Sequence, residues 1–357
     1  MTKKLLLLLL LNTALFAGNL ISLIPYKSNE FSPALKQTFK LSYILSEDAN
    51  VILEIYTPDS NLIRTIKVEN SKKGEHTLVW DGKDRKGIVV PNEAYNIVLH
   101  ANNKKTKQTL DYRKTGGIIL KELQTKIDQT GNINYTLSSP ARVLVRAGIE
   151  NGPMLRMISN WVPKNRGKIR QRWNMKDADN LVDISTLPFG ITVSAFALPK
   201  HAVITTNNKT LDYYTYFKDQ KLSCNTLPKE KQLLEREGKA ISKHAYTCRI
   251  KDRDPRLYLA MPKKEHKEQN LSVLINGKST LIKVSMHPED EAMLEKAKYE
   301  VSFFVDFEFT SEEELGFMPI SWNFVPNGIS QGEHILTVNV SSFTGQVGLK
   351  SYKFILK

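Results

Sequence analysis

The chain has 357 residues, of which 41% are hydrophobic, a formal net charge of +14 at pH 7 and two cysteines. This hydrophobic content allows a packed core, and the length suggests roughly two to four domains. Beyond the N-terminus no stretch is long and apolar enough to cross a membrane, which excludes a protein with several spans. The positive charge favours an acidic partner or an anionic surface and says nothing about the fold.

The chain begins with the pattern of a secretory signal peptide. A lysine pair precedes an apolar run over residues 5–16, and the small residues Ala17 and Gly18 offer a cleavage point. We therefore expect residues 1–18 to be removed and the mature protein to be periplasmic, secreted or on the cell surface. A retained N-terminal anchor is the alternative, because the cleavage motif is imperfect. Export excludes nucleic acid as a partner and leaves an acidic protein, a glycan or an anionic envelope surface.

The residues that follow contain an internal repeat. The segment LSYILSEDANV at 41–51 corresponds to INYTLSSPARV at 133–143, and further along Trp80 and Asp84 correspond to Trp173 and Asp177. This self-similarity predicts a duplicated domain of about 70 residues, with the two tryptophans in the cores. We place the two copies at residues 30–102 and 120–200.

Short alternating runs separated by turn residues make up each copy. In the first copy, the run 51–56 ends at the turn 57–61, and the runs 62–68, 76–80 and 95–101 follow. Strands of this length, with no helical pattern between them, predict a β-sandwich.

The two copies resemble the immunoglobulin-like domain of the flagellar hook-capping protein. The matching residues run from LSYILSEDANVILEIYTPDSNLIRTI through GEHTLVWDGKDRKGIVVPNEAYNIVLHA. The first copy departs from the family at Glu93, where Gly is preferred, and the second has Asn174 and Met175 where the first has Asp81 and Gly82. The resemblance implies immunoglobulin-like sandwiches with a binding or structural role. It does not imply hook capping, because a cleavable signal peptide is the wrong route for flagellar export.

The WDGKD turn of the first copy raises the alternatives of a metal loop and a simple turn. Its carboxylates, Asp81 and Asp84, share the loop with several cations, whereas Asp177, Asp179 and Asp183 of the second copy are better spaced for calcium. A hydrogen-bonded Asx turn is the alternative there. Because Asp81 is not retained in the second copy, we predict turns and expect neither a metal nor a cofactor.

The densest positive tract lies in the second copy and is a candidate partner-binding surface. An acidic partner or an anionic envelope surface would bind there, and a solvated strand face is the alternative. The tract consists of Lys164, Arg166, Lys168, Arg170 and Arg172.

Residues 201–264 break the strand pattern, and we predict a linker or insert. The charge spacing over 228–244 predicts a helix. In an oxidising export compartment Cys224 and Cys248 predict a disulfide, with two free buried thiols as the alternative.

A cluster of aromatic residues in the same segment is a second candidate binding surface. The tyrosines Tyr213, Tyr214 and Tyr216 are followed by Phe217. Strand alternation would place some of these rings on one exposed face, where they would stack on a sugar or a partner. An ordinary strand with half its rings buried is the alternative.

Alternating runs return in residues 265–357 and predict a third sandwich. We expect strands over 301–309, 332–340 and 351–356 and a short helix over 288–298, and the final hairpin resembles those of extracellular immunoglobulin-like domains.

Catalytic motifs do not occur in the sequence. The seven histidines show no HxxxH, HxH or HExxH spacing, and there is neither a GxSxG motif nor a Gly-rich phosphate loop. The acidic runs 288–291 and 312–314 are neighbours in sequence, whereas glycosidase carboxylates lie across a cleft from each other. We therefore expect no catalytic residues.

These features predict an all-β chain of tandem immunoglobulin-like sandwiches with a small helical or irregular insert. The function we expect is an exported, non-catalytic binding or scaffold protein of the bacterial periplasm or cell surface, an accessory subunit that binds an acidic protein of the envelope. The alternatives are a glycan- or envelope-binding module and a subunit of a periplasmic enzyme with its active site in residues 201–300.

Overall fold

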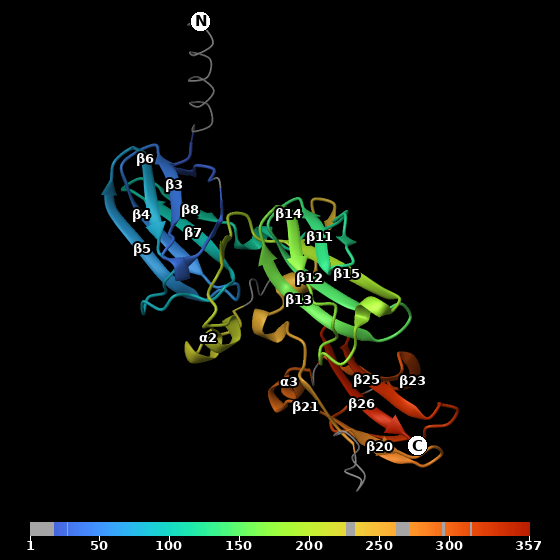
Figure 1. The fold of residues 1–357 in the computed structure, drawn as a ribbon. Coiled ribbons are helices and arrows are strands. Elements are labelled where there is room, and N and C mark those ends of the chain that lie inside the picture. The colour runs from blue at the N-terminus through green and yellow to red at the C-terminus, as the bar shows by residue number, and fades with distance from the viewer. Residues whose placement is uncertain (1–17, 27, 226–232, 262–270, 295–296, 315) are drawn as a thin grey trace, which may run out of the picture.

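The computed structural model describes residues 18–26, 28–225, 233–261, 271–294, 297–314 and 316–357. These residues form three β-sandwiches, each made of two sheets around its own hydrophobic core (Figure 1). The expectation of an all-β fold is confirmed, with two short α-helices in the described residues. No helix among those residues has the length and apolar character needed to span a membrane. The predicted signal peptide, apart from Gly18, lies outside them.

The first sandwich packs a three-stranded sheet, in the order β1-β3-β6, on a six-stranded sheet. The larger sheet has the order β2-β16-β7-β4-β5, and β8 pairs with β7. Alternation in β3 and β4 directs Leu41, Val51 and Leu53 into the core, where Trp80 is fully buried. The strands are β1 (Ile21–Leu23), β2 (Glu30–Phe31), β3 (Phe39–Leu45), β4 (Ala49–Tyr56), β5 (Leu62–Ser71), β6 (Gly74–Trp80), β7 (Ala94–Asn102), β8 (Lys107–Asp111) and β16 (Val203–Thr205).

One strand of this sandwich comes from far along the chain. β16 runs antiparallel to β7, with Val203 opposite Tyr95, and parallel to β2, with Ile204 opposite Glu30. The Thr205 N–H also donates to the Glu93 carbonyl at 2.9 Å. The chain therefore returns to the first sandwich after it has formed the second.

The second sandwich repeats the pairing of the first. Its sheets have the orders β10-β11-β14 and β13-β12-β15-β9, so β11 pairs with β14 as β3 pairs with β6. β12 lies between β13 and β15, as β4 lies between β5 and β7. Trp173 is buried in this core. The strands are β9 (Ile119–Leu120), β10 (Lys126–Ile127), β11 (Asn132–Leu137), β12 (Ala141–Ile149), β13 (Met154–Lys164), β14 (Gly167–Arg172) and β15 (Phe189–Ala197).

The third sandwich has the sheets β19-β21-β24 and β20-β26-β25-β22-β23. β19 lies before the predicted start at residue 265 and pairs with β21, so this sandwich extends into the predicted insert. The helix expected over 288–298 is present as α3, which spans Pro288–Leu294. The elements are β19 (Leu257–Ala260), β20 (Ser272–Leu274), β21 (Thr280–Met286), α3 (Pro288–Leu294), β22 (Tyr299–Val305), β23 (Glu308–Glu313), β24 (Ile320–Phe324), β25 (Gly332–Ser342) and β26 (Val347–Leu356).

The insert between β16 and β19 differs from the prediction in two places. Residues expected as a strand form helix α2 (Tyr213–Asp219), whose N-cap Asp212 accepts from the Thr215 N–H at 3.0 Å. The helix predicted over 228–244 is wrong where described, since β17 (Glu235–Arg236) and β18 (Lys239–Ala240) form a hairpin there. Gly238 in its turn has φ 70°, a conformation that glycine adopts readily. The 3₁₀ helices η4 (Lys243–Tyr246) and η5 (Arg249–Lys251) follow.

Candidate functional site

The WDGKD segment of the first sandwich and the corresponding WNMKD segment of the second form the same hydrogen-bonded turn. Trp80 Nε1 donates to the Lys83 carbonyl at 3.0 Å, and Trp173 Nε1 donates to the Lys176 carbonyl at 3.0 Å. Each indole is buried in its core while its N–H fixes the turn above it. The prediction that the two tryptophans are core residues is confirmed.

The aspartate four residues after each tryptophan, Asp84 or Asp177, is buried and bound by backbone N–H groups. Asp84 Oδ1 accepts from the Ile88 N–H at 3.0 Å, and Asp177 Oδ1 accepts from the Val182 N–H at 2.9 Å. The two side chains are 2% and 0% exposed. A carboxylate in this position holds a loop in one conformation, so the motif acts as an Asx-type turn in both copies.

The three acidic residues weighed as calcium ligands have different partners. Asp177 binds its own loop, and Asp183 caps a 3₁₀ turn and forms an exposed ion pair. Asp179 accepts from Lys350 Nζ at 2.5 Å and from the Ser351 N–H at 2.7 Å, both in β26. The described residues contain no group of three or more His, Cys, Asp or Glu side chains placed to hold a metal. Asp179 instead connects the second sandwich to the third.

Glu93 is the residue at which the first two sandwiches and the insert meet. Arg142 Nη1 of the second sandwich donates to Glu93 Oε1 at 2.8 Å, and Arg249 Nε of the insert donates to Oε2 at 3.2 Å. Arg249 Nη2 also donates to the Asn160 carbonyl in β13 at 2.8 Å. Glu93 is 2% exposed, and a carboxylate buried this deeply requires such partners. This contact explains why the chain has Glu where the hook-cap domain prefers Gly.

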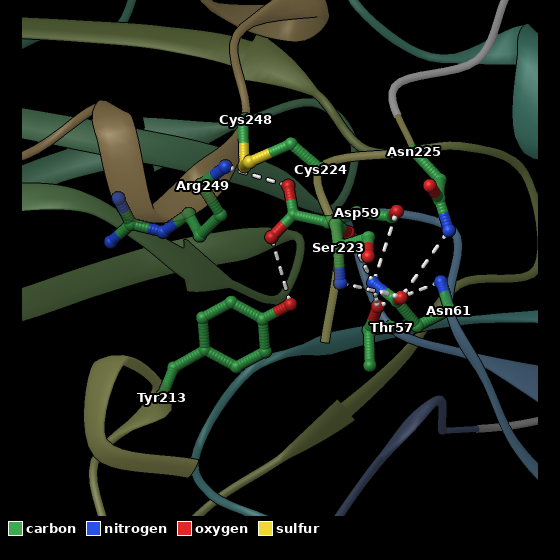
Figure 2. The surroundings of a disulfide bond; sticks show 9 residues. All are labelled: Thr57, Asp59, Asn61, Tyr213, Ser223, Cys224, Asn225, Cys248 and Arg249. Carbon is green, nitrogen blue, oxygen red and sulfur yellow. Dashed lines mark hydrogen bonds between the residues drawn. A yellow bond between two sulfur atoms is a disulfide. The ribbon is translucent and has the colours of Figure 1, made fainter. Parts of the chain in front are cut away.

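Asp59 is a second buried carboxylate at the same junction (Figure 2). Its Oδ2 accepts from the Tyr213 hydroxyl at 2.9 Å, and its Oδ1 accepts from the Arg249 N–H at 2.7 Å. Burial raises the pKa of Asp59, and these two hydrogen bonds oppose that rise. Asp59 therefore binds α2 and the start of η5 to the first sandwich.

The predicted disulfide between Cys224 and Cys248 is present next to this carboxylate, with 5.5 Å between the two Cα atoms (Figure 2). Beside it, Asn61 Nδ2 donates to the Ser223 carbonyl at 2.7 Å, and the Ser223 N–H donates to Asn61 Oδ1 at 3.0 Å. The disulfide and these hydrogen bonds hold both halves of the insert against one turn of the first sandwich.

The prediction of an exposed aromatic surface is wrong. Tyr213, Tyr216 and Phe217 are 9%, 1% and 7% exposed, because a helix places these three positions on one face, which is buried. Tyr216 also donates its hydroxyl to Asp84 Oδ2 at 3.0 Å. Sequence reasoning assumed a strand and so missed this packing.

Tyr214 lies on the other side of α2 and is partly exposed. Its hydroxyl donates to Glu289 Oε2 of the third sandwich at 2.6 Å, and the Arg253 guanidinium lies 4.0 Å from the ring centroid. The hydroxyl and the ring of Tyr214 therefore each already have a partner. None of the three predicted tyrosines forms a free stacking platform for a sugar.

A cavity of about 490 Å³ lies beside this junction. His244 Nδ1 lies 2.8 Å from Asp252 Oδ1, and Arg236 donates to the Gly116 carbonyl. His244 and Arg236 therefore have partners within the protein, as Arg142 and Arg249 have in Glu93, which is typical of a structural junction. The charged residues that line the cavity include Asp59, Arg142, Arg236, His244, Arg249 and Asp252.

The basic tract lies along an exposed sheet edge. Among the described strands β14 pairs only with β11. Its outward residues Lys168, Arg170 and Arg172 are exposed, while Ile169 and Gln171 alternate with them. Arg170 Nε donates to Asn132 Oδ1 at 3.2 Å, and within the described residues no carboxylate pairs with any of the three cations. We call these three residues the β14 basic row. Arg166 is exposed in the preceding turn, and Lys164 at the end of β13 is partly buried.

Comparison with known proteins defines the class of the first sandwich. Residues 28–105 match the FlgD Ig-like domain family, so the chain is a multi-sandwich protein that contains one such domain. The basal-body rod modification protein FlgD of Salmonella typhimurium (strain LT2) is 32% identical to this chain over 89 residues, and FlgD of Salmonella typhi gives the same values. The match covers 24% of this chain, which spans only 38% of the length of these relatives.

Solved structures with a similar fold include FlgD from P. aeruginosa, at 22% identity and a TM-score of 0.20, covering 26% of this chain and 64% of that one. A tetra-tandem repeat from the extending region of a large adhesion protein is also similar. It has 13% identity and a TM-score of 0.20, and it covers 94% of this chain and 73% of its own.

Proposed function

We propose that this protein is an exported, non-catalytic scaffold of the bacterial periplasm or cell surface that binds an acidic protein partner. In this role it is an accessory subunit of an envelope complex. The observation that carries the proposal is the β14 basic row, which has no carboxylate partner among the described residues and lies on the edge of a sheet.

An edge strand supports binding in two ways. Its outer backbone N–H and C=O groups are free to pair with a further strand, and its side chains add specificity. Lys168, Arg170 and Arg172 alternate along β14, so one positive row faces outward. A row of this kind speeds association with an acidic surface and rejects a basic one.

The buried junction supports a scaffolding role. Glu93 and Asp59 each bind groups from other parts of the chain, and the Cys224–Cys248 disulfide adds a covalent constraint. These contacts limit the relative motion of the first two sandwiches, so a partner meets a surface whose orientation is already set. A disulfide is also the bond expected of a protein in an oxidising compartment, in agreement with export.

The family match of the first sandwich supports a binding module. The first sandwich matches the FlgD Ig-like domain, and the chain spans well under half of the FlgD proteins it resembles. Rod modification belongs to the names of those proteins, and for this chain we propose only a binding role of the domain. The alternative of a glycan-binding module depended on an exposed aromatic surface, whereas Tyr213 and Tyr216 are buried.

The proposal is tested by affinity purification from an envelope extract with the triple variant Lys168→Glu, Arg170→Glu, Arg172→Glu. We expect the unaltered chain to retain a stoichiometric acidic protein and the variant to lose it by roughly tenfold or more, because three attractive charges become repulsive. The matched control, Lys104→Glu, Lys105→Glu, Lys107→Glu, makes the same change in net charge at exposed positions of the first sandwich and should bind normally.

Two results would contradict the proposal. One is equal recovery of the partner by the unaltered chain and the β14 variant. The other is binding of the unaltered chain to vesicles of anionic lipid, lost in the β14 variant, with no protein partner recovered. That second result would assign the basic row to an anionic envelope surface.

A further inference from the structure

The third sandwich also has a charged edge strand, and its charge is opposite to that of β14. β23 is the last strand in the order β20-β26-β25-β22-β23, and within the described part of the chain it pairs only with β22. Glu308, Glu312 and Glu313 are exposed on it, and among the described residues no cation pairs with them. We call these three residues the β23 acidic row; their partners in β22 place Glu308 and Glu313 on one face of the strand and Glu312 on the other.

An apolar side chain accompanies this acidic row. Phe309 in β23 is 56% exposed and contacts Phe304 through a ring pair with centroids 5.9 Å apart. An exposed ring surrounded by polar residues is typical of a contact surface, because aromatic residues provide much of the binding energy at interfaces.

The two edges complement each other and repel copies of themselves. β14 and β23 both have six residues, and each carries three exposed charges of one sign. Like charges directly opposite one another destabilise a strand pair, so β14 against β14 and β23 against β23 are disfavoured. β14 against β23 places opposite charges together. β14 and β23 lie apart from each other on different sandwiches of the chain (Figure 1), so a contact between them joins one copy to another.

We propose that the acidic partner of β14 is the β23 edge of a second copy of this chain. The inference rests on the proposed function and names the partner for the same site. Because the two surfaces differ, the contact is head-to-tail, and repeating it produces a ring or a filament rather than a closed twofold dimer.

Two features of the chain predict a weak, salt-sensitive contact. The register of β23 shifts between Phe303 and Phe304 of β22, and such a bulge twists the strand and shortens any regular backbone ladder with a further strand. The whole chain also carries a formal net charge of +14, which opposes the approach of two copies. Side-chain charge pairs, together with the exposed ring of Phe309, therefore carry the contact.

Sedimentation velocity of the full mature chain is the first test. We expect mass to increase with protein concentration at about 0.1 M salt and the association constant to fall by roughly tenfold or more near 1 M, where charges are screened within a few ångströms. The control Lys104→Glu, Lys105→Glu, Lys107→Glu keeps both rows and should associate like the unaltered chain.

Charge reversal gives a sharper result. The β14 variant Lys168→Glu, Arg170→Glu, Arg172→Glu has two acidic edges, and the β23 variant Glu308→Lys, Glu312→Lys, Glu313→Lys has two basic edges. Each variant alone should remain monomeric, and an equimolar mixture should associate, because every contact in the mixture again joins opposite charges. Circular dichroism and thermal melting show that each variant is folded.

Cross-linking then locates the contact. A zero-length carbodiimide reagent applied to a mixture of ¹⁴N and ¹⁵N protein should join Lys168 to a glutamate of the β23 acidic row in mixed-isotope pairs. A chain that is monomeric at every concentration and salt, or mixed-isotope links that avoid both rows, would overturn the inference. If the monomeric chain still captures an acidic protein through β14, the proposed function stands and the second copy is excluded as the partner.

Discussion

Arg142 in the second sandwich donates to Glu93 in the first at 2.8 Å, and both residues are more than nine-tenths buried. The carboxylate also accepts from Arg249 of the insert. One acidic side chain therefore joins three parts of the chain that are distant in sequence. Its removal affects the junction between the sandwiches more than either sandwich itself.

Glu93→Gln should destabilise this junction strongly. The substitution keeps the shape of the side chain but leaves two guanidiniums without their buried counter-charge, a situation that costs about 3–5 kcal/mol. Hydrogen exchange should show faster opening of β16 and η5, while the thermal transition moves to lower temperature. Glu69→Gln on the exposed edge strand β5 is the matched control, expected to stay within about 0.5 kcal/mol. Equal effects of the two substitutions would contradict the role of Glu93.

Removal of the disulfide should loosen the insert. The double substitution Cys224→Ser, Cys248→Ser opens a loop with a sequence separation of 24, which is worth about 3 kcal/mol in the chain-entropy picture. Chemical denaturation followed by hydrogen exchange measures the loss, which should be largest in α2 and η4. A reducing agent should reproduce the effect in the unaltered chain and leave the double variant unchanged; a variant that a reductant still destabilises would disagree with this account.

The contact between the insert and the third sandwich should depend on pH. Burial raises the pKa of Asp254 to about 6, and its Oδ1 accepts from the Val347 N–H at 2.9 Å. A folded-state pKa above the unfolded value near 3.8 means that folding favours the protonated acid. The stability that the raised pKa of Asp254 contributes is fully present below about pH 4 and is lost as the pH rises through about 6.

Thermal melting from pH 4 to pH 8 measures this dependence. Asp254→Asn should lack the pH-dependent part of the free energy of unfolding that Asp254 contributes, which is about 1–2 kcal/mol. This free energy is smaller than the full pKa shift would give, because the Asp254 side chain remains 18% exposed to solvent. Asp219→Asn at an exposed position of α2 should keep the unaltered pH profile. Identical profiles for the unaltered chain and Asp254→Asn would be the contrary result.

Tyr216→Phe should lower the stability of the first sandwich. The substitution removes the hydroxyl that donates to Asp84 Oδ2 at 3.0 Å and leaves a buried carboxylate oxygen without that donor. The expected loss is about 1–3 kcal/mol, measured by urea denaturation. Tyr258→Phe, at a position 50% exposed in β19, controls for removal of a tyrosine hydroxyl and should have little effect. A loss no larger than that of the control would show that the hydrogen bond is unimportant.

Much of the fold could be predicted because its signals are local. Alternation in β3 and β4 marks a half-buried strand without reference to the rest of the chain. The corresponding positions of Trp80 and Trp173 likewise indicated a shared turn. The two cysteines left a single intramolecular pairing, and that disulfide is present.

Helix α2 was missed because its aromatic residues have a high intrinsic preference for strands. Tertiary packing overrode that preference when Tyr213, Tyr216 and Phe217 became buried together. The sequence does contain a signal for the helix: Asp212 precedes it as an N-cap, and the three buried rings have helical rather than alternating spacing.

The junction could not be derived from local patterns, because its contacts join residues that are distant in sequence. Glu93 was visible as a departure from the hook-cap domain, yet nothing in the sequence identified Arg142 and Arg249 as its partners. β16 has only three residues, too few for alternation to indicate a strand.

The position of β16 between β2 and β7 also affects the order in which the protein folds. During synthesis or translocation the first sandwich emerges from the ribosome or the translocation channel well before residues 203–205 do. Its larger sheet therefore stays incomplete until the whole second sandwich has emerged. Contacts over so long a separation form slowly. Isolated residues 18–112 would keep β1 to β8 but lack β16 and expose the edge of β7 at Ala94 and Tyr95, so we expect them to be less soluble than the same sandwich within the full chain.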